Sequence, residues 1–170
     1  MRKHYSIFSK EKIVAFAVIL ALAVTAGVII GSCCQGETLA TVYAMCKPGS
    51  RVTIRRTPDG METGYLDCGD SFQTDGESSD GWIRCYGAGE NGWVYSGYVS
   101  TEPVQKVGQR YVCVAKKQVA CRRWMAGPQI DGKAGWLKNG QNVDVFVMGD
   151  GWAVTSRGYI KSEWLEVDPE

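Results

Sequence analysis

The sequence predicts an all-β protein in which two small barrels stand in tandem after one apolar N-terminal helix. Three observations support this prediction. A run of about 18 residues, Ile13–Ile30, holds no charged or strongly polar side chain. Beyond Cys34, short β-branched and aromatic runs alternate with clusters of Gly, Asp, Asn and Ser, which is the pattern of short strands and tight turns. Five short motifs of this part then recur in the same order, at a spacing of about 66 residues.

The N-terminal segment has the features of a membrane-directed sequence. Residues 1–12 carry four Lys or Arg side chains, and the apolar run after them is just long enough to cross a hydrocarbon core of about 30 Å as a helix. Because Lys and Arg stay on the cytoplasmic side, we expect residues 1–12 to form a cytoplasmic head. Residues 13–32 then form a transmembrane anchor or a signal, and the rest of the chain faces outward.

Three alternatives stay open for this segment. The stretch Ile30-Gly31-Ser32-Cys33 resembles the lipobox of bacterial lipoproteins, which makes Cys33 a candidate lipidation site. The apolar run is longer than the roughly 7 to 15 residues of a cleaved signal, which favours a retained single-pass anchor. Simple cleavage after Ala40 or Ala44 is the third alternative. All three place the barrels outside the cytoplasm, either on the cell membrane, lipid-anchored or secreted.

The repeated motifs define the two barrels. In order along the chain, the corresponding blocks are Val52-Thr53-Ile54-Arg55-Arg56 with Val119-Ala120-Cys121-Arg122-Arg123, Gly64–Gly69 with Gly135–Gly140, Phe72 and Thr74 with Val143 and Val145, Asp80-Gly81-Trp82 with Asp150-Gly151-Trp152, and Gly92–Ser100 with Gly158–Glu166. Their spacing shifts by only a few residues, at loops. The shared order argues against chance similarity and for a duplicated domain.

On these residues each copy resembles a bacterial SH3 domain of the SH3b type. The shared features are an apolar-x-apolar-Arg strand, a G-x-L-x-x-G turn, an Asp-Gly-Trp turn and a closing Gly-Trp-Val or Gly-Tyr-Ile. The resemblance predicts SH3-like barrels at residues 40–103 and 110–167, with Val104–Gln109 as a short linker. It also implies a ligand: peptidoglycan, in particular its peptide stems or cross-bridges.

Two local features follow from the motifs. Trp82 and Trp152 come directly after glycines at the start of alternating strands. A barrel of about 60 residues needs a few large side chains to fill its small core, so both are predicted to be core or half-buried residues. Asn139-Gly140 predicts a hairpin turn between Leu137 and Val143.

Charge and composition narrow the classes of function. The net charge of +1 argues against a nucleic-acid partner, although residues 37–105 hold 5 basic and 10 acidic side chains and residues 106–170 hold 10 and 7. The single histidine, His4, lies in the predicted head, so no exported imidazole can act as a general base in a Ser-His or Cys-His hydrolase. We therefore expect a chain that is not an enzyme and that uses no cofactor.

Five cysteines lie in the predicted barrels, and they could form disulfides in an oxidising compartment: Cys46, Cys68, Cys85, Cys113 and Cys121. No C-x-x-C spacing or histidine supports a metal site. Cys113 and Cys121 would face each other across a three-residue hairpin loop, which makes them a candidate disulfide. A buried free thiol is the alternative, because Cys121 occupies the apolar position of Ile54. Since five is odd, at least one thiol stays free unless it joins Cys34 or another chain.

Recognition of a ligand remains as the predicted role. Extended peptides suit grooves that are edged by aromatic and polar side chains. The candidate ligand-binding residues, which differ between the copies or lie by loops, are Tyr65, Tyr95, Trp124 and Trp136. We predict a non-catalytic cell-envelope protein that binds peptidoglycan peptides. The rival prediction is a membrane-anchored protein–protein interaction scaffold in an envelope, secretion or transfer assembly, whose partner would complement the opposite charges of the two halves.

Overall fold

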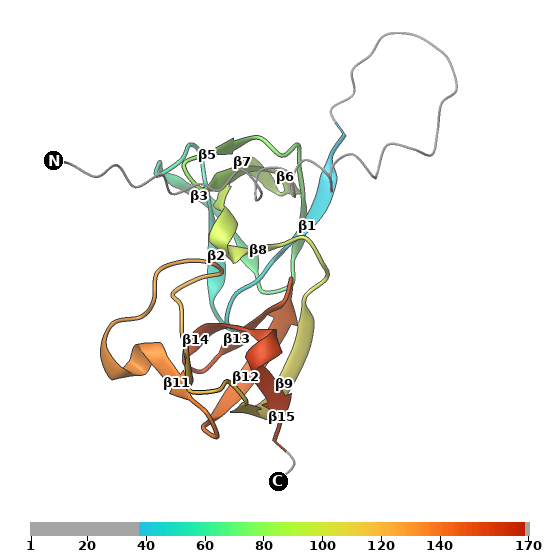
Figure 1. Cartoon of the computed structure of the whole chain (residues 1–170). Coiled ribbons are helices and arrows are strands. Elements are labelled where there is room, and N and C mark those ends of the chain that lie inside the picture. Colours follow the sequence, from blue (N-terminus) through green and yellow to red (C-terminus); the bar gives the residue numbers. More distant parts are fainter. Residues whose placement is uncertain (1–37, 169–170) are drawn as a thin grey trace, which may run out of the picture. The chain divides into compact units, whose positions relative to one another are not determined.

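The computed structural model describes residues 38–168, which belong to one compact unit (Figure 1). The predicted head, the apolar segment and Cys33 lie outside the described residues. Residues 38–168 form strands and short 3-10 helices, so the predicted all-β class is confirmed. A search of this part of the chain for a helix that could span a membrane finds none.

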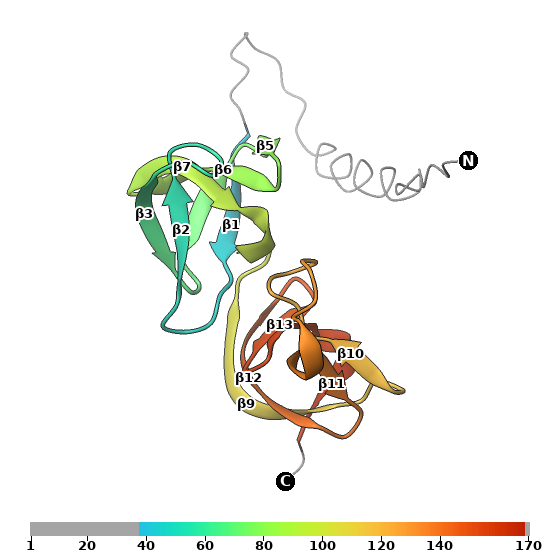
Figure 2. The same ribbon diagram turned by 90° about the vertical axis from the view of Figure 1, so that its left-hand side faces the viewer.

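The first eight strands form one curled antiparallel sheet, which we call the first barrel (Figure 2). Its elements are β1 (Ala40–Ala44), β2 (Arg51–Arg55), β3 (Glu62–Asp67), β4 (Ser71–Thr74), β5 (Ser78–Ser79), β6 (Trp82–Ala88), β7 (Glu90–Tyr95), η1 (Ser96–Tyr98) and β8 (Val99–Ser100). The strand order is β3-β2-β7-β6-β4-β1-β8, and β5 pairs with β6.

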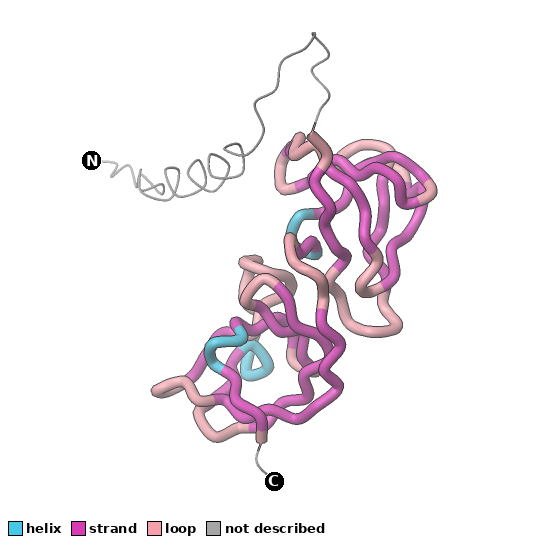
Figure 3. Tube along the Cα trace, turned by 90° about the vertical axis from the view of Figure 1, so that its right-hand side faces the viewer, coloured by secondary structure: helices cyan, strands magenta, loops and turns pink. Residues whose placement is uncertain are grey.

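The remaining strands form a five-stranded sheet and a two-stranded sheet, which together we call the second barrel (Figure 3). Its elements are β9 (Gln105–Cys113), β10 (Gln118–Ala120), η2 (Gly132–Gly135), β11 (Trp136–Lys138), β12 (Asn142–Gly149), β13 (Trp152–Thr155), β14 (Gly158–Lys161), η3 (Ser162–Trp164) and β15 (Leu165–Val167). The larger sheet has the order β14-β13-β12-β9-β15, and β10 pairs with β11.

Corresponding residues of the two copies fill corresponding positions in the two cores. The pairs that are buried in both copies are Ile54 and Cys121, Leu66 and Leu137, Phe72 and Val143, and Val94 and Ile160. Each barrel thus has its own apolar cluster, as small domains require. The repeated motifs encode the same packing twice.

A glycine and an arginine make the same contact in each copy. A Cβ atom on Gly92 would lie 2.5 Å from the carbonyl oxygen of Arg55, and one on Gly158 would lie 2.6 Å from that of Arg122. Real Cβ atoms do not approach backbone atoms this closely. Only glycine therefore allows β7 to pack against the carbonyl of Arg55 and β14 to pack against the carbonyl of Arg122. This close approach explains why the closing motif of each copy begins with Gly.

The Asp-Gly turns form tight hairpins in both barrels. Asp80 and Gly81 have φ values of 48° and 85°, and Asp150 and Gly151 have 52° and 70°. Two successive residues with positive φ make the type I′ turn, whose twist suits antiparallel strands. Trp82 follows its turn into the core and is 9% exposed, as predicted. Trp152 is half-buried, which agrees with the prediction that both tryptophans are core or half-buried residues.

The predicted linker is in fact the start of a strand. Residues 105–109 belong to β9, in which Gln105 pairs with Met148 and Lys106 with Val147 of β12. The register shifts between Val145 and Val147, beside Gly108 with its φ of 64°. Such a β-bulge, together with mostly exposed side chains, interrupts the apolar alternation by which a strand is recognised in a sequence.

The turn at Asn139-Gly140 does not join two paired strands. Gly140 has the expected positive φ of 73°, but β11 pairs with β10 whereas β12 pairs with β9. The chain therefore passes from one sheet to another at this turn. Turn chemistry fixes the local change of direction, and tertiary packing decides which strand edges then meet.

The proposed pairing of Cys113 with Cys121 rests on a hairpin that the structure does not contain. Cys113 lies opposite Leu165 of β15, whereas the N–H of Cys121 donates to the carbonyl oxygen of Gly135. Both residues are fully buried free thiols. Cys121 is therefore a buried free thiol, as the second alternative predicted, at the position that corresponds to Ile54 of the first copy.

We expect Gly92→Ala to lower the free energy of unfolding by about 1–3 kcal/mol, because the added methyl group collides with the carbonyl of Arg55. Urea unfolding measures this loss. Gly64→Ala is the matched control, since its Cβ would lie 3.5 Å from the Ile54 side chain, an ordinary contact. Equal effects of the two substitutions would contradict the steric explanation.

Candidate functional site

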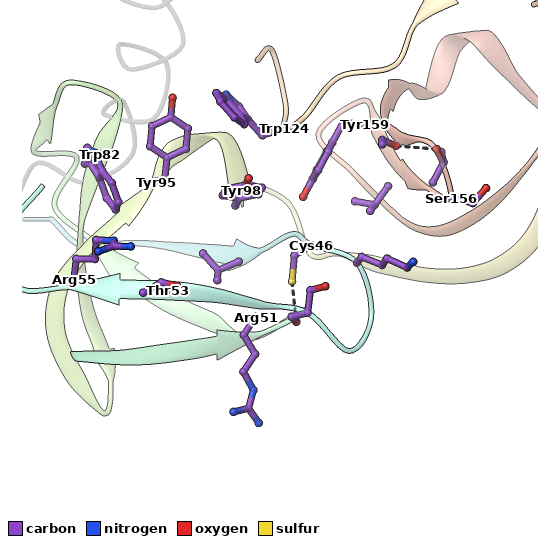
Figure 4. A pocket seen from close by; sticks show the side chains of 16 residues that line it. Cys46, Arg51, Thr53, Arg55, Trp82, Tyr95, Tyr98, Trp124, Ser156 and Tyr159 are labelled. Carbon is purple, nitrogen blue, oxygen red and sulfur yellow. Dashed lines mark hydrogen bonds between the residues drawn. The ribbon is translucent and has the colours of Figure 1, made fainter. Parts of the chain in front are cut away.

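The candidate site is a groove of about 680 Å³ that both barrels line (Figure 4). Strand β2 and the segment before it form one side, and a row of aromatic side chains forms another. The basic and aromatic residues that line the groove include Arg51, Arg55, Trp82, Tyr95, Tyr98, Trp124 and Tyr159. The first barrel contributes five of these residues, and Trp124 and Tyr159 come from the second.

The aromatic side chains form a continuous row. Ring centroids lie 5.4 Å apart between Trp82 and Tyr95 and again between Tyr95 and Trp124, with interplanar angles of 75° and 87°. Tyr98 lies 6.3 Å from Trp124 and 6.0 Å from Tyr159. These edge-to-face and tilted geometries are the favoured ones for aromatic pairs. The rings hold each other in place and present a preformed apolar surface.

Two glycines hold Trp124 in this row. A Cβ atom on Gly97 would lie 2.3 Å from Cδ1 of Trp124, and one on Gly127 would lie 2.4 Å from its Nε1. The indole therefore packs directly against backbone of both barrels. The N–H of Met125 also donates to the carbonyl oxygen of Gly97 over 3.0 Å, which fixes the segment that carries the indole.

Tyr159 joins the barrels through a buried hydrogen bond. Its hydroxyl donates to the carbonyl oxygen of Met45 over 2.7 Å, and burial raises the pKa of Tyr159. The ring belongs to an apolar cluster with Met45 of the first barrel and Met125, Val147 and Val154 of the second. This shared cluster forms the floor on which the aromatic row rests.

The groove is basic. Lys47, Arg51 and Arg55 line it, and none of the described residues that line it is acidic. Arg55 lies over the ring of Trp82, 5.9 Å from its centroid, and donates to the carbonyl oxygen of Gly60. The guanidinium groups also meet carboxylates outside the groove, Arg51 with Asp67 at 2.8 Å and Arg55 with Glu62 at 3.1 Å. These exposed pairs are weak and orient the arginines without neutralising the groove completely.

Two of the four predicted ligand-binding residues lie in the groove. Tyr95 and Trp124 are half-buried there and contact each other. Tyr65 lies on β3, is 53% exposed and donates to Glu62, a hydrogen bond that raises the pKa of Tyr65. Trp136 is 38% exposed and borders a separate pocket beside Ile130. The structure therefore does not bring the four residues together.

The sequence did not predict most of the groove. Trp82 was predicted only as a packing residue, Tyr98 and Tyr159 were not among the four predicted binding residues, and no role was predicted for the basic residues of β2. One signal was present in the sequence: Gly97 of the first closing motif corresponds to Glu163 of the second. The Trp124 indole can pack against this position only when the residue there is glycine. The difference between the copies therefore shows where Trp124 contacts the first barrel.

No cluster of three or more His, Cys, Asp or Glu side chains within residues 38–168 is placed to hold a metal ion. Every buried side-chain nitrogen or oxygen in this part of the chain has a hydrogen-bond partner. The chemistry that the groove offers is therefore that of aromatic faces, guanidinium and ammonium groups, and the hydroxyls of residues such as Thr53 and Ser156.

No family model and no curated protein matches the chain. Among solved structures, it is similar to NlpC1 from Trichomonas vaginalis, with 12% identity and a TM-score of 0.34 over 85% of this chain and 51% of that one. It is also similar to NlpC2 from the same organism, with 15% identity and a TM-score of 0.32 over 79% and 50%. The chain thus spans about half the length of these two structures.

These comparisons correct one prediction. The sequence led us to expect a chain that is not an enzyme, because its only histidine lies at position 4. Both neighbours are NlpC proteins, and neither comparison bears out a chain that is not an enzyme. The missing histidine concerns only the general bases within this chain, and the chain corresponds to about half of each neighbour. The prediction of a non-enzyme is therefore withdrawn.

We expect Gly97→Ala to displace Trp124 and to lower the free energy of unfolding by about 1–3 kcal/mol. The near-ultraviolet circular dichroism of the coupled rings should weaken, while the far-ultraviolet signal of the strands is retained. Ser96→Ala, at an exposed neighbouring position, is the control and should change neither. An unchanged near-ultraviolet spectrum in Gly97→Ala would contradict the described packing of the indole.

Proposed function

We propose that this protein binds peptidoglycan peptides outside the membrane, in the groove between the two barrels. The observation that carries the proposal is the juxtaposition of a preformed aromatic row with a basic strand across one groove. The resemblance of the two copies to bacterial SH3 domains supports the same ligand class. The predicted segment 13–32 would hold the protein at the cell envelope.

The chemistry of wall peptides suits this lining. A stem peptide is extended, presents amide groups along its length and carries free carboxylates. Arg55 and Lys47 supply cations for the carboxylates, and arginine in particular can bind a carboxylate through two hydrogen bonds. Arg51 lies at the edge of the groove, and its guanidinium points away from the aromatic row toward Asp67 (Figure 4). The rings of Tyr95 and Trp124 offer faces for the methyl groups and amide planes of short side chains. Preformed rings also reduce the entropy cost of ordering the site on binding.

An extended segment of another envelope protein is the rival ligand. It would share the backbone amides and could carry Asp or Glu side chains to the same cations. Binding to purified peptidoglycan separates the two ligands, because only a wall peptide is present in it.

The full-length protein in mild detergent should pellet saturably with peptidoglycan sacculi stripped of protein and teichoic acid. Trp124→Ala should weaken this binding about tenfold or more, because it removes a central ring that contacts both barrels. Circular dichroism checks that the variant is folded.

Trp136→Ala is the matched control, since it removes the same side chain from a pocket outside the groove, and its binding should stay within about twofold of the wild type. If the wild type remains in the supernatant, peptidoglycan is not the ligand and the search moves to an envelope protein. If Trp136→Ala weakens binding as much as Trp124→Ala, the groove is not the binding site.

A further inference from the structure

The first barrel contains a pair of cysteines that the groove does not explain. Cys46 follows β1 and is 5% exposed, whereas Cys68 lies at the corner after β3 and is half-buried. The thiol of Cys68 donates to the carbonyl oxygen of Cys46 over 2.8 Å, and the thiol of Cys46 donates to the carbonyl oxygen of Ser50 over 3.3 Å. The two side chains lie close enough to shift each other's pKa. Two thiols, 22 positions apart in sequence, thus meet at one place.

This pair occurs in only one of the two copies. Ala44 of β1 and Cys113 of β9 occupy equivalent places, because each carbonyl accepts a hydrogen bond of 2.8 Å from the glycine of the following corner. Two positions after these residues, Cys46 corresponds to Ala115. Directly before the two corner glycines, Gly69 and Gly140, Cys68 corresponds to Asn139. Both cysteines are therefore replaced together in the second copy. The barrel does not need a thiol at either position, which argues for a chemical role of the pair.

The environment makes the two thiols unequal. The neighbouring Cys46 side chain lowers the pKa of Cys68 to about 6, and the neighbouring Cys68 side chain raises the pKa of Cys46. Cys68 is therefore the thiol that more readily reaches the thiolate form, which attacks a disulfide. Cys46 is the thiol that reacts second. By contrast, burial alone raises the pKa of Cys85 in the same barrel to about 11.

We propose that Cys46 and Cys68 are a thiol–disulfide exchange site and form an intramolecular disulfide. The co-reactant is an external disulfide, RSSR, of a small thiol or of another protein. Sγ of Cys68 attacks one sulfur of RSSR, which forms a mixed disulfide and releases RS⁻. Sγ of Cys46 loses its proton, attacks Sγ of Cys68 and releases the second RS⁻. Two protein thiols are thereby oxidised to one disulfide, and RSSR is reduced to two RSH, which take up the two protons.

The disulfide would lie beside the groove. Cys46 and Lys47 both line the groove, and the preceding residue, Met45, accepts the hydrogen bond of Tyr159. A bond to Cys68 would tie this edge of the groove to the corner between β3 and β4. It would also close a loop of the unfolded chain and so stabilise the first barrel.

The full-length protein in mild detergent, treated with oxidised glutathione at pH 7 and then alkylated, tests the proposal. Cleavage at methionine, lysine and arginine places Cys46 on residues 46–51 and Cys68 on residues 62–84, each without another cysteine. We expect these two fragments to be joined in most molecules and to separate on reduction. Cys85 in the same sample should remain a free thiol. The rate at which Cys68 reacts with an alkylating reagent should rise with pH through about 6.

The residues of the second copy provide the matched variants, Cys46→Ala and Cys68→Asn. In Cys46→Ala the glutathione adduct on residues 62–84 should persist, because the second thiol is missing. Separate fragments 46–51 and 62–84 in the oxidised wild type would overturn the proposal, and so would a wild-type glutathione adduct that never resolves. Both readouts come from the wild-type chain and need no groove ligand, so they are independent of the proposed function.

Discussion

The arrangement of the groove depends on the packing of the two barrels against each other. Its centre is the buried hydrogen bond from the Tyr159 hydroxyl to the Met45 carbonyl, within an apolar cluster that both barrels share. Two hydrogen bonds of 2.8 Å from Thr101 to the carboxylate of Asp150 add to it at an exposed position. A buried hydroxyl that lost its acceptor would cost about 1–3 kcal/mol, so these contacts favour one arrangement of the barrels. The aromatic row and the basic strand face one groove only in that arrangement.

The differences between the copies matter as much as the duplication. Each barrel keeps the residues that its own core needs, such as Leu66 and Leu137, and each keeps the glycine that passes over an arginine carbonyl. The copies differ where they meet: Gly97 admits Trp124 into the first barrel, whereas the second barrel has a glutamate at that position. The cysteine pair is likewise confined to the first copy. A duplicated barrel has thus become a unit with two unequal halves and a groove that neither half forms alone.

The sequence predicted the features that depend on local pattern. The order of the motifs gave the all-β class, and the Asp-Gly turns and the burial of Trp82 follow from turn chemistry and alternation. It predicted less well wherever distant residues decide the outcome. The sequence predicts a linker at 105–109, where the structure has a strand, because the pairing of this strand with β12 has no local signature. Tyr95 and Trp124 were selected separately, and nothing in the sequence indicated that they touch or that Tyr65 and Trp136 lie elsewhere.

The most direct test of the central claim, that one groove between the barrels binds the ligand, uses the indole N–H resonances of the six tryptophans. A ¹⁵N-labelled protein would be titrated with a soluble, uncross-linked stem-peptide fragment of peptidoglycan. If this groove binds the ligand, the resonances of Trp82 and Trp124 shift together with a single saturation curve, while those of Trp136 and Trp164 stay in place. Shifts confined to Trp136 or Trp164, or no shifts at saturating ligand, would contradict it.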